Sequence, residues 1–116
     1  MEHQVYSKNV IVTDSLQEYL ASRLAHFDKL AESVTSCRVD ISRDQHHRKG
    51  EVFRVEINLN VPGTLLRSVE VNADARAAID LASDTLLRQL RKYKSKRNDS
   101  QRRLKTAFKN IFRRKS

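Results

Sequence analysis

The chain contains very few of the residues that mark tight turns, cross-links or membrane spans. Its 116 residues include two glycines, one proline, one cysteine and no tryptophan. Two glycines are too few for a glycine-rich phosphate loop, and one cysteine cannot form an internal disulfide. No apolar run is long enough for a signal peptide or a membrane-spanning helix. We therefore expect a cytoplasmic protein in which Cys37 is a buried structural thiol.

Positive charge, in contrast, is abundant and concentrated at one end of the chain. The whole chain has 23 lysines and arginines against 14 acidic residues, a net charge of +9. Residues 91–116 alone hold twelve basic residues and one acidic residue, so residues 1–90 carry a net charge of −2. A near-neutral body with a cationic end indicates a protein that binds a polyanion. Charge alone leaves both nucleic acid and an anionic membrane open as that partner.

Hydrophobic periodicity predicts a single α+β domain. Alternating patterns indicate strands, and apolar residues three or four positions apart indicate two long amphipathic helices. The order is strand, helix, three strands, helix, over residues 5–12, 14–31, 37–41, 53–61, 65–71 and 74–96. Because each strand and each helix has one apolar face, we expect a two-layer sandwich with both helices on one face of a four-stranded sheet. Thr13 or Asp14 caps the first helix, and Asp74 caps the second.

The last residues predict a separate basic tail. Asn98 is a plausible stop for the second helix, and Asp99 or Ser100 is able to cap a short third helix. Leu104, Phe108 and Ile111 then share one face of that helix among many basic residues. We accordingly divide the chain into a domain of residues 1–97 and a basic amphipathic tail of residues 98–116.

The sequence contains no strong candidate for a catalytic or metal-binding site. No serine, cysteine or lysine has a recognisable catalytic partner pattern, and His46-His47 fits a solvated loop better than a metal site. Asp80 and Asp84 lie one helical turn apart and are expected to form surface pairs with Arg76 and Arg88. The sequence thus predicts neither an enzyme nor a bound metal or cofactor.

Three motifs resemble one known family. Residues 74–94, D-A-R-A-A-I-D-L-A-S-D-T-L-L-R-Q-L-R-K-Y-K, are similar to the last helix of the ribosome hibernation-promoting factor and ribosome-associated inhibitor family. The first helix, V-T-D-S-L-Q-E-Y-L-A-S-R-L-A-H-F-D-K-L, and the turn N-L-N-V-P-G-T-L-L-R resemble the same family. The resemblance covers roughly residues 3–96, and the chain looks like a short form without the family's C-terminal dimerisation domain.

The resemblance implies a factor that silences idle ribosomes. It implies binding to the small ribosomal subunit and its rRNA in the decoding region, where tRNA and mRNA otherwise sit. The rRNA-binding residues carried over by position are Arg23, His26, Lys29, Arg88, Arg91, Lys92 and Lys94. A structural role for Arg23 and Lys29, whose stems can cover the edge of the core, is the alternative. A general RNA-binding module or RNA chaperone of similar fold is the second functional hypothesis.

The basic tail extends the expected binding surface. Its candidate polyanion-binding residues, with the two bases that precede it, are Lys96, Arg97, Arg102, Arg103, Lys105, Lys109, Arg113 and Arg114. Phosphate binding by these residues is favoured over an anionic membrane or a protein partner, given the domain to which the tail is attached. The absence of a second domain leads us to expect a monomer when the protein is off the ribosome.

Overall fold

The computed structural model describes residues 2–30, 34–44 and 50–115, and the side chains of these residues as far as Ile111. Its elements are β1 (Glu2–Lys8), α1 (Asp14–Leu30), β2 (Ser36–Asp44), β3 (Val52–Val61), β4 (Thr64–Asn72) and α2 (Ala75–Lys115). This order confirms the predicted α+β class. The predicted loop of His46-His47 lies outside the described residues.

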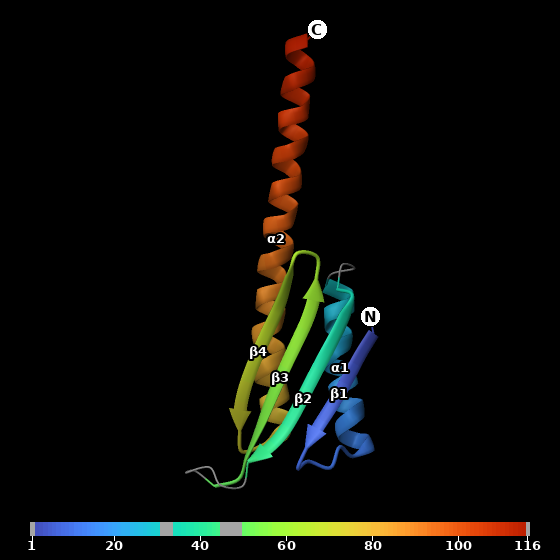
Figure 1. Cartoon of the computed structure of the whole chain (residues 1–116), viewed down its shortest axis with the longest axis vertical. Helices are drawn as coiled ribbons and strands as arrows, with labels where there is room; N and C mark the ends of the chain where they lie inside the picture. The colour runs from blue at the N-terminus through green and yellow to red at the C-terminus, as the bar shows by residue number, and fades with distance from the viewer. Residues whose placement is uncertain (1, 31–33, 45–49, 116) are drawn as a thin grey trace.

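The four strands form one mixed sheet, in the order β1-β2-β3-β4. β1 runs parallel to β2, and the two hairpins that follow are antiparallel. Both helices lie on one face of this sheet, as the sequence predicts (Figure 1). No helix or strand of the described residues covers the opposite face, which we call the open face.

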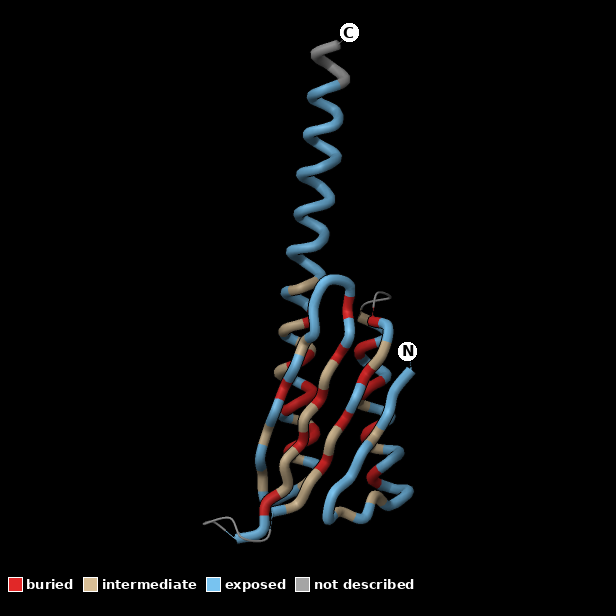
Figure 2. The backbone as a smooth tube through the Cα atoms, viewed as in Figure 1, coloured by how far each residue is buried: buried red, intermediate tan, exposed pale blue. Residues whose placement is uncertain are grey.

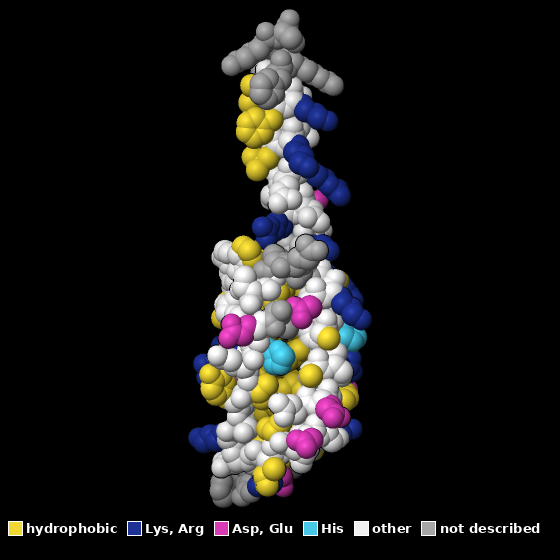
Figure 3. Space-filling view, turned by 90° about the vertical axis from the view of Figure 1, so that its right-hand side faces the viewer, with side chains coloured by type: hydrophobic (Ala, Val, Ile, Leu, Met, Phe, Trp, Pro, Cys, Tyr) yellow, Lys and Arg dark blue, Asp and Glu magenta, His cyan; other side chains and the backbone are white. Residues whose placement is uncertain are grey.

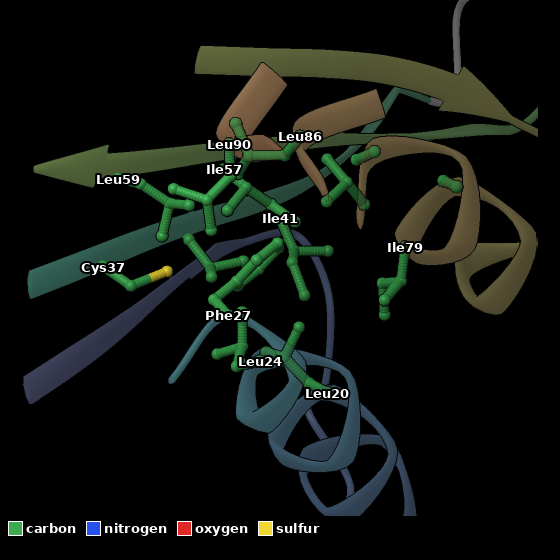
Figure 4. Packing of buried hydrophobic residues seen from close by; sticks show 14 of the residues in the cluster. Leu20, Leu24, Phe27, Cys37, Ile41, Ile57, Leu59, Ile79, Leu86 and Leu90 are labelled. Carbon is green, nitrogen blue, oxygen red and sulfur yellow. The ribbon is translucent and has the colours of Figure 1, made fainter. Parts of the chain in front are cut away.

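The register places one apolar face of each strand toward the helices. Val39 of β2 pairs with Ile57 of β3, and both are fully buried. Leu20, Leu24 and Phe27 of α1 meet these strands together with the apolar face of α2, and buried residues follow the layer between the sheet and the helices (Figures 2 and 4). Cys37 belongs to the same layer, and desolvation by this burial raises the pKa of its thiol to about 12. The predicted burial of the Cys37 thiol is thereby confirmed.

The first strand differs from the prediction of residues 5–12. β1 covers Glu2–Lys8, and the chain leaves the sheet at Asn9, whose φ of 59° lies in the left-handed region. Asparagine tolerates this conformation better than most residues do. Val10 and Val12, which made the segment look like a strand, instead pack against the core from the loop before α1.

Side-chain oxygens cap both helices. The Leu16 amide donates to Thr13 Oγ1 at 3.2 Å, which selects Thr13 over Asp14 as the cap of α1. The Arg76 amide donates to Asp74 Oδ1 at 3.0 Å at the start of α2. Each cap satisfies a backbone amide that has no partner within its helix.

α2 continues through the predicted stop at Asn98, so the prediction of a separate third helix is wrong. It is one helix of 41 residues, about 60 Å long at ~1.5 Å per residue. Asn98, Asp99 and Ser100 cost a helix only a few tenths of a kcal/mol each, and neither glycine nor proline lies nearby. Residues 98–115, which we call the extension, project beyond the body of the molecule (Figures 1 and 2).

We predict that burial along α2 determines which substitutions destabilise the protein. Leu86 is fully buried, and Leu81 on the outer side of the same helix is 45% exposed. Leu86→Ala should lower the free energy of unfolding by about 2–5 kcal/mol, because it leaves a cavity. Leu81→Ala should change it by less than about 1 kcal/mol. Denaturant titrations measure both values, and equal effects would contradict the described packing of α2.

Candidate nucleic-acid interface

The candidate interface is the outer surface of the two helices, on the side away from the sheet. α1 and the first half of α2 pack against each other, so side chains separated by about sixty residues in the sequence lie side by side. The predicted site residues of the two helices therefore belong to one surface. The contacts between α1 and α2 determine which side chains surround each of these residues.

A polar cluster joins the helices at this surface. Asp80 of α2 accepts hydrogen bonds from the Tyr19 hydroxyl and from Arg23 Nε, the latter at 2.8 Å. A second guanidinium nitrogen of Arg23 lies 2.6 Å from the same carboxylate. Arg76 lies over the Tyr19 ring, 5.1 Å from its centroid, and donates to Ser15 Oγ at 2.7 Å. The predicted pair between Asp80 and Arg76 is thus wrong, because the partners of Asp80 come from α1.

The hydrogen bonds of this cluster stabilise the charged forms of Asp80 and Arg23. Burial raises the pKa of Asp80, but hydrogen bonds from Tyr19 and Arg23 outweigh it and lower that pKa overall. The Arg23 guanidinium has its pKa raised by the hydrogen bonds to Tyr19 and Asp80. Arg23, a predicted rRNA contact, therefore also has a structural role, through an ion pair with α2 in addition to the stem packing that the sequence suggested as its alternative.

Three other predicted residues surround a shallow hollow between the helices. His26 and Lys29 of α1 and Arg91 of α2 line it, and Leu30 and Leu87 form its apolar part. Lys94 Nζ donates to the Leu30 carbonyl at 3.0 Å, so a cation caps the C-terminal end of α1, where the helix dipole favours it. The hollow thus presents side chains of basic type from both helices at one place.

Basic residues, which we call the basic ridge, line the outer side of α2 and have Asp99 among them, 4.0 Å from Arg102. At about 100° per residue, all its members except Lys96, which lies at the border, fall on the half of the helix that faces away from the sheet. They are Arg88, Arg91, Lys92, Lys96, Arg102, Arg103, Lys105 and Lys109, all exposed. Because α2 is unbroken, the ridge extends for ~32 Å from Arg88 to Lys109.

Two predicted polyanion contacts lie off this ridge. Arg97 turns toward the body and donates to the Tyr93 hydroxyl at 3.4 Å, while Lys94 caps α1 as described. The side chains of Arg113 and Arg114 lie outside the described part of the structure. The sequence predicted all eight residues of the ridge as contacts but not the single helix that carries them, although the lack of glycine and proline after Lys96 was a signal for a continuous helix.

Comparison with known proteins assigns the domain. Residues 3–98 match the model of the family described as Sigma 54 modulation protein / S30EA ribosomal protein. The chain belongs to this family. The extension lies almost entirely beyond the matched residues.

Relatives and solved structures agree with this assignment. The chain is 40% identical over 94 residues to the ribosome hibernation promotion factor of Deinococcus radiodurans, covering 81% of this chain and 49% of that protein. It is 34% identical over 100 residues to the protein of the same name from Picosynechococcus, covering 83% and 50%. The chain spans about half the length of these curated relatives.

The N-terminal domain of Thermus thermophilus Protein Y has a similar structure, with a TM-score of 0.69 and 31% identity over 80% of this chain and 99% of that one. A ribosomal subunit interface protein from Coxiella burnetii shares the fold, with a TM-score of 0.72 and 20% identity over 82% and 99%. The fold class is therefore that of known family members.

The described residues show two further absences. None of the helices they form is both long and apolar enough to cross a lipid bilayer. The same residues contain no group of three or more histidine, cysteine, aspartate or glutamate side chains placed to hold a metal ion.

We predict that Asp80→Asn destabilises the protein at neutral pH by about 1 kcal/mol, the size expected for a partly exposed charge-assisted pair. Since the pKa of Asp80 is lowered on folding, its contribution is present above the ordinary value of 3.8 and is lost as the pH falls through the folded-state pKa. The difference from the wild type should therefore shrink below about pH 4. Denaturant titrations across this pH range measure it.

Asp84→Asn is the matched control, because Asp84 is exposed one turn further along α2. It removes the same charge without touching the α1–α2 cluster and should leave stability nearly unchanged. If both variants lost the same stability, the cluster would contribute nothing beyond general charge.

Proposed function

We propose that this protein is a ribosome-associated hibernation factor that binds the small ribosomal subunit and silences or stabilises idle ribosomes. The observation that carries the proposal is the basic ridge, which lies on the outer helical surface of a domain from this family. Relatives of this domain are named ribosome hibernation promotion factors. A ribosomal partner also places the protein in the cytoplasm.

The geometry supports binding to RNA phosphates. Phosphates of a nucleic acid form a closely spaced row of negative charge, and lysines and arginines that neutralise them release bound counterions. The ridge offers eight basic side chains spread over the outer side of α2, and all of them are exposed. His26 and Lys29 add a second contact at the hollow between the helices, which Arg91 of the ridge also lines. We assign the rRNA contact to these two features.

Arg23 and Lys94 then act as positioning residues in this proposal. Arg23 holds α1 to α2 through Asp80, and Lys94 holds the end of α1 through the Leu30 carbonyl. These bonds set the position of His26 and Lys29 relative to the ridge. Occupation of the decoding region by this surface would exclude tRNA and mRNA sterically, and no chemical step is needed.

We predict that Arg88→Gln together with Lys92→Gln weakens binding to small subunits and relieves inhibition of cell-free translation. Both residues are exposed on the ridge, so the double variant should fold as the wild type does. The salt dependence of binding should also become shallower, by up to about 0.9 in log–log slope for each lost phosphate contact. Co-sedimentation with purified subunits at several salt concentrations measures these changes.

The matched control is Lys8→Gln together with Arg38→Gln. It removes the same charge from the open face of the sheet, opposite the helices, and should leave subunit binding intact. Equal weakening in both variants would show that net charge, not the ridge, determines binding. Equal affinity of the wild type for unstructured RNA and for small subunits would support the general RNA-binding module instead.

A second prediction concerns the extension. A chain that ends after Arg97 loses seven basic residues, of which Arg102, Arg103, Lys105 and Lys109 belong to the ridge. It should stay folded, because the extension's side chains are exposed as far as Ile111. Subunit binding should weaken and its salt dependence should become shallower, while some inhibition remains through residues 88–96. Unchanged binding would show that the extension does not contact RNA.

A further inference from the structure

RNA binding by the ridge does not explain the apolar side of the extension. Leu104, Phe108 and Ile111, the extension stripe, are between 51% and 60% exposed. A second exposed apolar set lies on the open face of β4 and consists of Leu65, Val69 and Val71, between 37% and 51% exposed. We call it the open-face strip. Apolar groups that cluster in this way on a surface indicate an interaction site more often than isolated ones do.

The extension stripe and the open-face strip face the same side of the molecule. At about 100° per residue, the extension stripe lies within ~60° of the direction of Leu90, which is buried against the sheet. The stripe therefore faces the side of the molecule on which the sheet lies. Figure 3 shows this: the hydrophobic side chains of the extension gather on the left, which is the side of the open face, and the basic ones lie on the right.

The two sets also match in length. Tyr93 donates to the Pro62 carbonyl at 2.7 Å, so α2 reaches the end of the β3–β4 hairpin near this residue. α2 then continues for about 33 Å beyond Tyr93, of which the extension makes about 26 Å, and β4 itself, Thr64–Asn72, is about 26 Å long. The extension is thus long enough to cover β4, the strand at one edge of the sheet, where an open face is turned toward the extension stripe.

We propose that a second copy of this chain covers the extension stripe, in a dimer with a two-fold axis perpendicular to α2 near the end of the β3–β4 hairpin. The two α2 helices run antiparallel, and each extension lies across the open face of the partner. Each sheet is then packed between its own α2 and the extension of the other copy. Phe108 lies ~22 Å beyond Tyr93 along α2, and Val69 lies ~20 Å from Gly63 along β4, so this symmetry sets Phe108 at about the level of Val69 of the partner subunit.

Charge favours this arrangement over a simple pair of extensions. Two extensions packed stripe to stripe would bring many cations together, with Asp99 as the one acidic residue in each. The open face has its arginines paired instead: Glu56 lies 2.6 Å from Arg67 and 3.1 Å from Arg54. In the proposed dimer the basic ridge stays on the outside. The dimer replaces the expectation of a monomer off the ribosome, which rested on the missing second domain.

Folding of the extension onto its own sheet is the competing arrangement. It requires a chain reversal between Arg97 and Gln101, where α2 is a regular helix. A continuous helix already points its stripe to the correct side for a partner, so a second copy needs no rearrangement. The same apolar sets serve both arrangements, and covalent trapping therefore has to separate them.

The test uses the full chain, purified free of nucleic acid. Sedimentation equilibrium should show a concentration-dependent mass approaching twice the 13.5 kDa of the chain. High salt should preserve or strengthen the dimer, because it screens the ridges while leaving apolar burial intact. Phe108→Asp should raise the dimer dissociation constant at least about tenfold, since each dimer loses two buried aromatic rings. Asn110→Asp adds the same charge on the outer side of the helix and should have no such effect.

Disulfide trapping locates the contact. A mixture of Val69→Cys and Phe108→Cys chains should form a mixed disulfide dimer under mild oxidation, and a mixture of Val69→Cys and Asn110→Cys should not. Cys37 does not interfere, because it is buried and its pKa is about 12. A wild type that is monomeric at all concentrations, or a Val69→Cys, Phe108→Cys double variant that closes a disulfide within one monomer, would overturn the proposal.

Discussion

The packing of one side of α2 against the sheet, from Ala78 to Leu90, determines the direction of every other surface on this helix. Ala78, Ile79, Ala82, Leu86 and Leu90 are all fully buried there. A helix is stiff, so the direction fixed by these residues is carried along the unbroken chain to its end. The basic ridge must then face away from the sheet, and the extension stripe must face the side of the sheet. A kink near Asn98 would remove both relations.

Charge in this protein is divided between a paired body and a ridge rich in bases. In the body, Asp80 binds Arg23, and Glu56 binds Arg54 and Arg67. These pairs stabilise the α1–α2 contact and the open face while they neutralise much of the local charge. Beyond residue 90 a single acidic residue, Asp99, accompanies twelve basic ones. A surface with so many basic residues and so few acidic ones is suited to a partner that carries many phosphates.

Sequence reasoning succeeded where one local pattern settled the outcome. Leu20, Leu24 and Phe27 recur at helical spacing, and all three are buried; Val55, Ile57 and Leu59 alternate, and they too are buried. It failed where weak local signals competed. Val10 and Val12 suggested strand, but a left-handed residue at Asn9 had already taken the chain out of the sheet. Asn98 suggested a stop, but the helix formers on both sides outweighed its small cost.

The sequence by itself determined which elements form, which side of each is apolar and where the positive charge lies. These properties depend on the spacing of neighbouring residues, which the chain carries locally. Only the tertiary structure decided that Asp80 binds Arg23 and Tyr19, that His26 and Lys29 meet Arg91, and that the extension stripe and the open-face strip face the same side. Such relations join residues from different elements, so they exist only once both helices have packed on one face of the sheet.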